Sequence, residues 1–170
     1  MTWLRHIARL RVAIGFLCGG VAIWFSHPTR ASLLAGGAVA LAGEAIRLWA
    51  AGHLDKGREV TSSGPYRFTR HPLYLGSTVI GLGLAYASAS VAVALLAITY
   101  LGVTLTAAIR TEEAHLTDKF GAAYPAYRAG RTDGERRYFS VARAIRNREY
   151  RAVLGLLFVL IVFAWKARLL

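Results

Sequence analysis

Five apolar stretches, each close to the length that crosses a lipid bilayer, constrain this chain more than any other feature. A helix needs roughly 20 apolar residues to cross the hydrocarbon core. The stretches cover about 12–26, 31–51, 73–89, 91–109 and 152–165. The chain is 55% hydrophobic yet has a net charge of +12, with the charges segregated between the stretches. This pattern predicts an all-α integral membrane protein with about five transmembrane helices, in a single domain over residues 1–170.

Lys and Arg predict the orientation of these helices, because cytoplasmic loops are enriched in basic residues. Most of them lie near the N-terminus, in 52–72 and in 110–151. The opposite side of the five-helix arrangement holds Arg30, Lys166 and Arg168. We therefore expect the N-terminus and both large polar segments in the cytoplasm, with the protein in the inner membrane of a bacterium. The basic excess then reflects topology and attraction to anionic lipid, and not nucleic-acid binding.

Two polar clusters border the third and fourth stretches on the same predicted side of the membrane. RHPLY (70–74) precedes the third stretch, and RTEE (110–113) follows the fourth. The short link around YASASV (86–91) predicts a tight helical hairpin, so the two clusters should face each other. A pocket of His, Tyr, Gly and paired carboxylates there suits a ligand of mixed charge with a flat ring. Taken separately, the clusters are equally compatible with interfacial anchors and a self-paired helix surface.

Glu44 and Arg47 are charged residues inside the second stretch. Because they are three positions apart, they share a helix face and can pair. A buried functional site is one interpretation, since ionisable groups inside a bilayer are expensive. A structural pair, with Arg47 reaching the cytoplasmic interface near Trp49, is the interpretation that we favour.

The segments SGPYRFTRHPLYLG (63–76) and RTEEAHLTDKFGAAYPAYR (110–128), joined by the hairpin, resemble the integral membrane methyltransferases. These are the isoprenylcysteine carboxyl methyltransferases and the phospholipid N-methyltransferases, which use S-adenosylmethionine. The resemblance implies methyl transfer from S-adenosylmethionine to a lipophilic acceptor, an isoprenoid carboxylate or a phospholipid amine. It places the cofactor pocket at the cytoplasmic face of the membrane. We expect neither a metal nor a nucleic acid as a partner.

The resemblance also implies roles for particular residues. The cofactor-binding set joins the first cluster, two glycines of the third stretch and the acidic pair: Arg70, His71, Pro72, Leu73, Tyr74, Gly81, Gly83, Glu112 and Glu113. The candidate catalytic residues are Arg110 and Glu113, and the candidate substrate contacts are Arg110, Tyr124 and Tyr127. An amine acceptor must lose a proton, for which Glu113 and His71 are the candidate bases.

Two other classes of function remain open. Membrane reductases of the sterol-reductase type have a similar RHPxY corner and bind NADPH, but they are longer and contain more spans. A non-catalytic membrane scaffold would use the same motifs as interfacial anchors. Binding of S-adenosylmethionine and not NADPH would separate the three classes.

After residue 128 the chain departs from the resemblance. The families continue with a short basic segment that contains prolines, whereas this chain continues with GRTDGERRYFSVARAIRNREYR (130–151) and a further apolar stretch. Arginines alternate with aromatic and aliphatic residues over 136–151. That pattern predicts an amphipathic helix that lies on the membrane and gates the entry of the acceptor.

Overall fold

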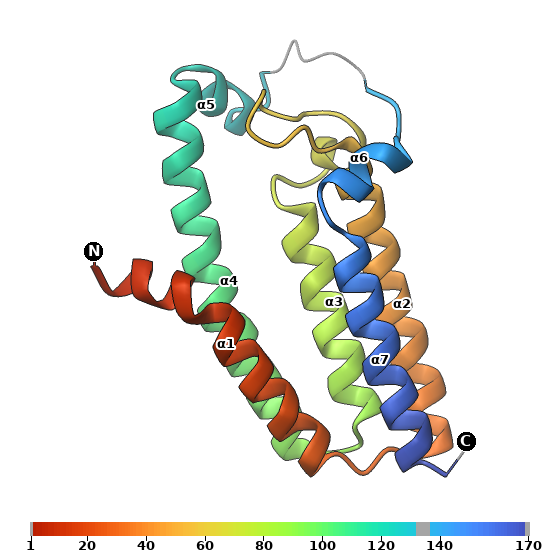
Figure 1. Cartoon of the computed structure of the whole chain (residues 1–170). Coiled ribbons are helices and arrows are strands. Elements are labelled where there is room, and N and C mark those ends of the chain that lie inside the picture. The colour runs from red at the N-terminus through yellow and green to blue at the C-terminus, as the bar shows by residue number, and fades with distance from the viewer. Residues whose placement is uncertain (1, 132–136, 169–170) are drawn as a thin grey trace.

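The computed structural model describes residues 2–131 and 137–168, and for residues 2–12 it describes the backbone alone. The long helices are α1 (Thr2–Phe25), α2 (Arg30–His53), α3 (Pro72–Ala87), α4 (Val91–Phe120) and α7 (Tyr150–Lys166). The short elements are the 3-10 helix η1 (Gly64–Arg67), α5 (Ala123–Arg128) and α6 (Val141–Arg146). No strand occurs among the described residues, which confirms the predicted all-α class (Figure 1).

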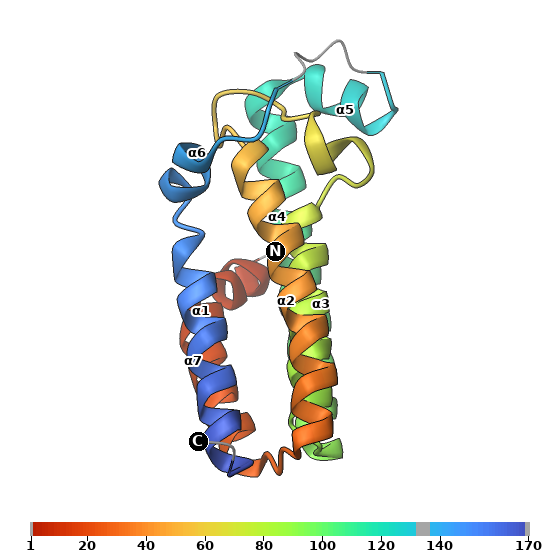
Figure 2. The same cartoon turned by 90° about the vertical axis from the view of Figure 1, so that its right-hand side faces the viewer.

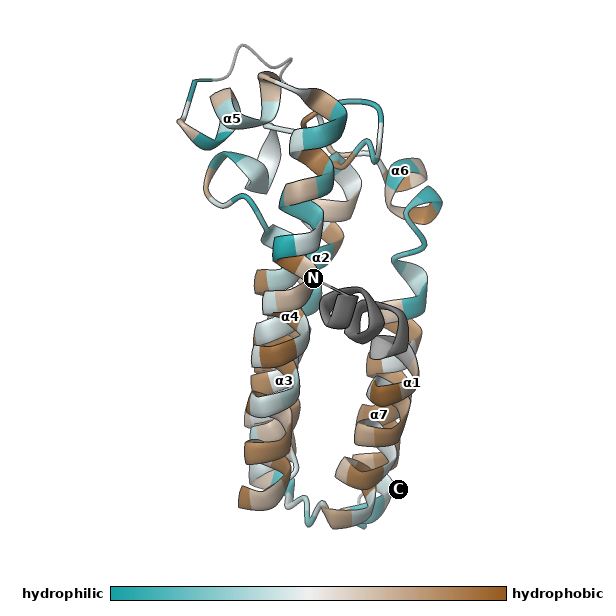
Figure 3. Ribbon diagram, turned by 90° about the vertical axis from the view of Figure 1, so that its left-hand side faces the viewer, coloured by the Kyte–Doolittle hydropathy of each residue, from teal (hydrophilic) through white to brown (hydrophobic). Residues whose placement is uncertain are grey.

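Each predicted span corresponds to one long helix, but the helices differ in how well they suit a bilayer. α2 and α4 are long and apolar enough to cross a membrane, whereas α3 and the Ala13–Phe25 part of α1 are shorter apolar helices. Figure 3 shows apolar helix shafts and a hydrophilic end that includes α5 and α6. Large side chains on the shafts, such as Phe16 and Trp24, are 79% and 80% exposed, which requires an apolar environment. The chain is therefore membrane-associated, and five complete crossings stay a prediction.

The closest helix pair is α2 with α3, because glycines line both facing surfaces. A Cβ at Gly43 would lie 2.7 Å from the backbone nitrogen of Ile80, and one at Gly83 would lie 2.5 Å from that of Ala40. Such backbone approach requires small residues at the contact. The small residues of GFLCG (15–19) and LLAGGAVALAG (33–43) predict close packing of the first two apolar stretches, and this prediction is wrong. Gly36 and Gly43 face α3 and Gly37 faces Leu160 of α7, while α1 packs against α4.

At the end of the molecule opposite the hydrophilic end, α7 ends beside the link between α1 and α2 (Figure 2). Lys166 donates hydrogen bonds of 2.6 Å to the carbonyl oxygens of Ile23 and Ser26. These carbonyls lie at the C-terminal end of α1, where a helix has acceptors without intrahelical partners. Phe163, which is 2% exposed, packs against Leu33 of α2. Helix α7 thus joins α1 to the α2–α3 pair.

The predicted hairpin between α3 and α4 is present, with Ser88, Ala89 and Ser90 as its link. Ala89 has a φ of 49°, which turns the chain, and the Ser90 hydroxyl accepts a 3.4 Å hydrogen bond from the Val93 N–H at the start of α4. The antiparallel pairing brings the start of α3 and the end of α4 to the same hydrophilic end of the molecule (Figure 1).

Arg47 joins three helices. Its Nε lies 4.0 Å from Glu44 Oε2, and it donates a much shorter hydrogen bond of 2.6 Å to Glu149 Oε1 before α7. It also donates to Ser77 Oγ and, at 3.4 Å, to the Leu73 carbonyl of α3. The predicted pair with Glu44 is therefore the weaker of its two ion pairs. Its contacts fasten α2 to both α3 and α7.

The segment predicted as one amphipathic helix over 136–151 is organised differently. Helix α6 covers Val141–Arg146 alone, and a residue with a φ of 60°, Arg148, separates it from α7. Residue 136 and the four before it lie outside the described residues. The prediction of a continuous helix is wrong because a left-handed residue interrupts the hydrogen-bond ladder that such a helix needs.

Candidate functional site

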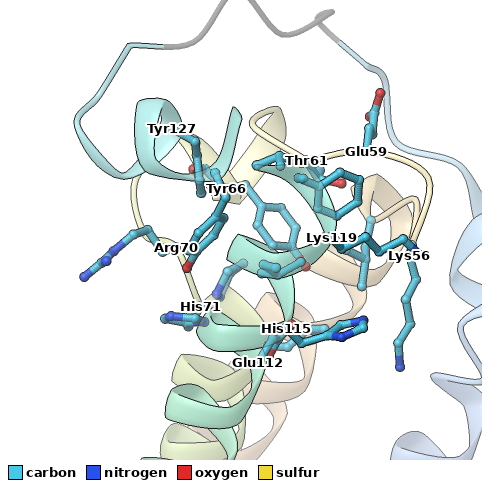
Figure 4. A pocket seen from close by; sticks show the side chains of 18 of the residues that line it. Lys56, Glu59, Thr61, Tyr66, Arg70, His71, Glu112, His115, Lys119 and Tyr127 are labelled. Carbon is cyan, nitrogen blue, oxygen red and sulfur yellow. The ribbon is translucent and has the colours of Figure 1, made fainter. Parts of the chain in front are cut away.

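A cavity of about 580 Å³ lies at the hydrophilic end of the molecule (Figure 4). Its walls come from the loop after α2, from the start of α3, from the end of α4 and from α5. This volume falls within the range of about 300–1,000 Å³ that is usual for small-molecule sites. The cavity therefore has room for a cofactor-sized ligand.

The first cluster is shaped by the turn into α3. Pro72 occupies the first helical position, where its missing N–H breaks no hydrogen bond, and His71 precedes it. The loop before this turn contains Gly57 and Gly64, with φ values of 77° and 58° that favour glycine. A Cβ at Gly64 would also lie 2.5 Å from the His53 ring. The local sequence thus holds His71 and the residues around it at the wall of the cavity.

Glu113 connects the two predicted clusters. Its Oε1 accepts a 3.0 Å hydrogen bond from Arg70 Nη1 and lies 3.1 Å from His71 Nε2. Residues from the start of α3 and the end of α4, more than 40 positions apart, therefore meet at one carboxylate oxygen. A carboxylate on one ring nitrogen fixes the orientation of the imidazole. The hairpin argument from the sequence correctly anticipated that these clusters would meet.

Three tyrosines line the side of the cavity that η1 and α5 form. Tyr66, 8% exposed, accepts through its carbonyl a 2.7 Å hydrogen bond from the Tyr127 hydroxyl of α5. Burial raises the pKa of Tyr66, and it raises the pKa of Tyr127 to about 12. Burial, with the nearby charge of Glu113, raises the pKa of Tyr124 to about 12. All three phenols are protonated at neutral pH and are therefore hydrogen-bond donors, and Tyr127 already donates its proton to the Tyr66 carbonyl.

The cavity combines charges of both signs. Its ionisable lining, apart from the tyrosines, consists of Lys56, Glu59, Arg70, His71, Glu112, His115 and Lys119. Figure 4 shows these groups around Tyr66, with Arg70 and Lys56 on opposite sides of the view. Apolar surface from residues such as Leu116 and Phe120 completes the walls. A zwitterionic ligand with a flat apolar group matches this arrangement of charges and surfaces.

Several lining residues were not singled out from the sequence: Lys56, Glu59, Tyr66, His115 and Lys119. His115 and Lys119 follow Glu112 by three and seven positions, so helical periodicity places them on the same face of α4. That spacing could have predicted from the sequence that His115 and Lys119 line the α4 side of the cavity. The loop residues had no comparable signal, because their positions depend on how the loop folds over the cavity.

Most predicted site residues line the cavity, namely Arg70, His71, Pro72, Leu73, Tyr74, Glu112, Tyr124 and Tyr127. The other four do not line it, and of these Glu113 contacts Arg70 and His71 instead. Gly81 faces Leu101 of α4, and Gly83 faces Ala40 of α2, so neighbouring helices occupy the space beside both of these predicted cofactor-binding glycines. Arg110 is exposed on α4 and is not part of the cavity wall.

A second, more apolar groove of about 500 Å³ lies between α3 and α4. Its lining includes Leu82, Leu101 and Leu105 along the helix shafts. The groove and the cavity share two residues, His71 and Tyr74. The structure thus places a cavity with charged side chains in its walls next to a more apolar groove, with the imidazole of His71 at their boundary.

No group of three His, Cys, Asp or Glu residues that could hold a metal ion occurs among the side chains described for residues 13–131 and 137–168.

Residues 10–123 match the phospholipid methyltransferase family. This match covers more than half of the chain and includes both clusters that meet at Glu113. No curated protein and no solved structure matches the chain. Tyr124, Tyr127 and the residues beyond them lie outside the matched range.

Proposed function

The chain belongs to the phospholipid methyltransferase family, and we propose that it transfers a methyl group from S-adenosylmethionine to a lipophilic acceptor at the cytoplasmic face of the membrane. The observation behind this proposal is the cavity with charged side chains in its walls, which adjoins a more apolar groove through His71 and Tyr74. One compartment suits a water-soluble, charged methyl donor, and the other suits a hydrocarbon chain. A methyl group crosses between the two ligands where the compartments meet.

The residues of the cavity fit S-adenosylmethionine by their chemistry. Glu112 and Glu59 are the carboxylates that would bind the ammonium of its amino-acid part, and Lys119 and Arg70 are the cations for its carboxylate. The ring of Tyr66 with Leu116 and Phe120 would form the apolar wall for adenine. When bound, the cofactor supplies an electrophilic methyl group on a sulfonium, which needs no metal or further activation.

His71 is the proposed base for an amine acceptor. Its Nε2 lies 3.1 Å from Glu113 Oε1, so the carboxylate orients the ring and stabilises the imidazolium that forms when the ring accepts a proton. Glu113 itself is occupied by Arg70 and His71, which makes it a positioning group in this scheme. A carboxylate acceptor would need no base, and the site would then act by alignment and exclusion of water. Arg110 stays a candidate contact for the acceptor head group outside the cavity.

The groove between α3 and α4 is the proposed site of the acceptor's hydrocarbon chain. It lies along the apolar helix shafts, so a lipid can enter it from the bilayer without passing through water. The head group would then lie at His71 and Tyr74 while the cofactor enters from the aqueous side. This arrangement explains why the reaction is performed within a membrane.

Purified protein in phospholipid nanodiscs tests the function. We expect calorimetry to detect S-adenosylmethionine binding and no NADPH binding, and mass spectrometry to detect bilayer lipids that gain one methyl group. Binding of NADPH alone would favour the reductase, and binding of neither ligand would favour the scaffold.

A matched pair of variants tests the acceptor groove. Gly102 lines the groove, and a Cβ at this position would have no heavy atom within 4 Å, so a larger side chain there fills empty space. Gly102→Phe should raise the KM for the lipid acceptor several-fold and leave cofactor affinity unchanged, with Gly102→Ala as the control. An unchanged KM in Gly102→Phe would contradict the assignment of the groove.

A further inference from the structure

Residues 137–149, which we call the C-terminal segment, cover the end of α2 at the hydrophilic end of the molecule. The Ser140 N–H and Arg143 Nη1 donate to the Gly52 carbonyl at 3.1 and 3.0 Å. Asn147 Nδ2 donates to the carbonyls of Ala51 and Leu54 at 2.9 and 2.8 Å. The last carbonyls of a helix have no intrahelical partner, so these contacts supply what the end of α2 lacks.

The contact between the C-terminal segment and α2 is also close. A Cβ at Gly52 would collide with the ring of Phe139, so the aromatic ring lies directly on the glycine backbone. The same ring packs beside His53, with ring centroids 6.2 Å apart. The C-terminal segment is therefore held to α2 by both hydrogen bonds and packing.

Arg137 extends this attachment to the loop after α2. Its Nη1 donates a 2.8 Å hydrogen bond to Asp55 Oδ2, and its Nη2 donates a 2.9 Å hydrogen bond to Glu59 Oε2. The hydrogen bond from Arg137 lowers the pKa of Asp55, so the ion pair persists at neutral pH. Glu59 and its neighbours Lys56 and Gly57 line the cavity. One guanidinium thus bridges two points of a loop that forms the cavity wall.

The other end of the C-terminal segment is anchored within the helix bundle. Glu149, which is 5% exposed, accepts the 2.6 Å hydrogen bond from Arg47 of α2. The segment therefore connects a buried ion pair at the start of α7 to the loop over the cavity. All of it lies beyond residue 123, where the family match ends.

We propose that the C-terminal segment is a clamp that holds residues 54–63 as the wall of the cavity, with Arg137 as its positioning residue. The loop contains glycine and few regular hydrogen bonds, so many conformations are accessible to it when no other segment holds it. By bridging Asp55 and Glu59, Arg137 restricts the loop to the conformation in which it lines the cavity. The effect on methyl transfer rests on the proposed function, whereas the effect on the loop does not.

Hydrogen–deuterium exchange of ligand-free protein in nanodiscs tests the clamp directly. Arg137→Ala should raise exchange in 54–63 by about tenfold or more, because it removes both hydrogen bonds to the charged groups Asp55 and Glu59. Arg137→Lys, which can reach one carboxylate at a time, should give an intermediate rate. Arg137→Ala combined with Asp55→Asn should exchange no faster than Arg137→Ala alone, because both changes break the same contact.

The control is Arg151→Ala, which removes an exposed arginine on α7 and should leave exchange in 54–63 unchanged. In calorimetry, Arg137→Ala should weaken S-adenosylmethionine binding several-fold, since the ligand must then order the loop. Wild-type exchange in 54–63 of the Arg137→Ala protein would overturn the clamp. Failure of the wild-type protein to bind S-adenosylmethionine would overturn the proposed function, and the exchange rates would still decide the clamp.

Discussion

Glu113 connects residues that lie far apart in the chain. One of its oxygens lies 3.0 Å from Arg70 Nη1 and 3.1 Å from His71 Nε2, so the start of α3 is tied to the end of α4 at the boundary between cavity and groove. The neighbouring Glu112 lines the cavity instead. Two adjacent carboxylates therefore have different tasks, because successive helix positions point about 100° apart.

Substitutions of two cavity residues test the assignment of the cofactor site. His71→Ala and Glu112→Gln should each weaken S-adenosylmethionine binding by about ten- to a hundredfold, because a hydrogen bond to a charged group contributes roughly 1.5–3 kcal/mol. Both residues lie near the aqueous end, so the variants should stay folded in detergent. Calorimetry on the purified proteins gives the affinities.

Glu44→Gln is the matched control for this series. Glu44 is 4% exposed in α2, outside the cavity lining, and its carboxylate oxygens accept no hydrogen bond from the described residues. The cofactor affinity of this variant should equal that of the wild type. Wild-type affinity in both folded cavity variants would leave the first cluster as a membrane anchor.

At the scale of the elements, the contact between α2 and α3 positions the start of α3, which lines the cavity. Glycines on both helices let their backbones approach, and α3 begins at the cavity. Arg47 adds polar contacts from α2 to Ser77 and Leu73 of α3. In a membrane, where water does not drive helices together, such close packing and internal hydrogen bonds are the main sources of association.

Adding one methyl group should change the stability of the protein at this contact but not at an open helix face. A Cβ in Gly83→Ala would lie 2.5 Å from the backbone nitrogen of Ala40, so the helices must separate, and overpacking of this kind costs about 1–3 kcal/mol. The same change at Gly102 of α4 meets no atom within 4 Å and should be neutral or slightly stabilising. Unfolding in mixed micelles measures both free energies, and equal stability of the two variants would contradict the packing argument.

At the scale of the whole molecule, polarity is divided along the long axis. The apolar shafts of the helices meet a hydrophilic end that contains the cavity, α5 and α6 (Figure 3). The cavity therefore lies at the hydrophilic end of the apolar helix shafts. This division is consistent with a water-soluble methyl donor and a lipid acceptor reaching the same imidazole from different phases.

Topology reporters test the orientation that the Lys and Arg distribution predicts. A reporter fused after Leu170 should report the outer side, and one inserted at Asp133 should report the cytoplasm. Both positions lie outside the described residues. Only the predicted crossing of α7 lies between them, so they should be on opposite sides of the membrane. If both reporters lie on one side, α7 does not cross the membrane and the five-helix arrangement fails.

The sequence by itself determined the helical class, the membrane association and the meeting of the two clusters, because hydrophobic runs and a short hairpin link are local properties of the chain. The tertiary structure decided which helices pack together. It assigned Arg47 to Glu149, 102 residues away, and not chiefly to its helical neighbour Glu44. It also turned Gly83 toward α2 and placed Arg137 against the loop over the cavity. These choices depend on which surfaces fit at close range, and the spacing of residues along one helix does not contain that information.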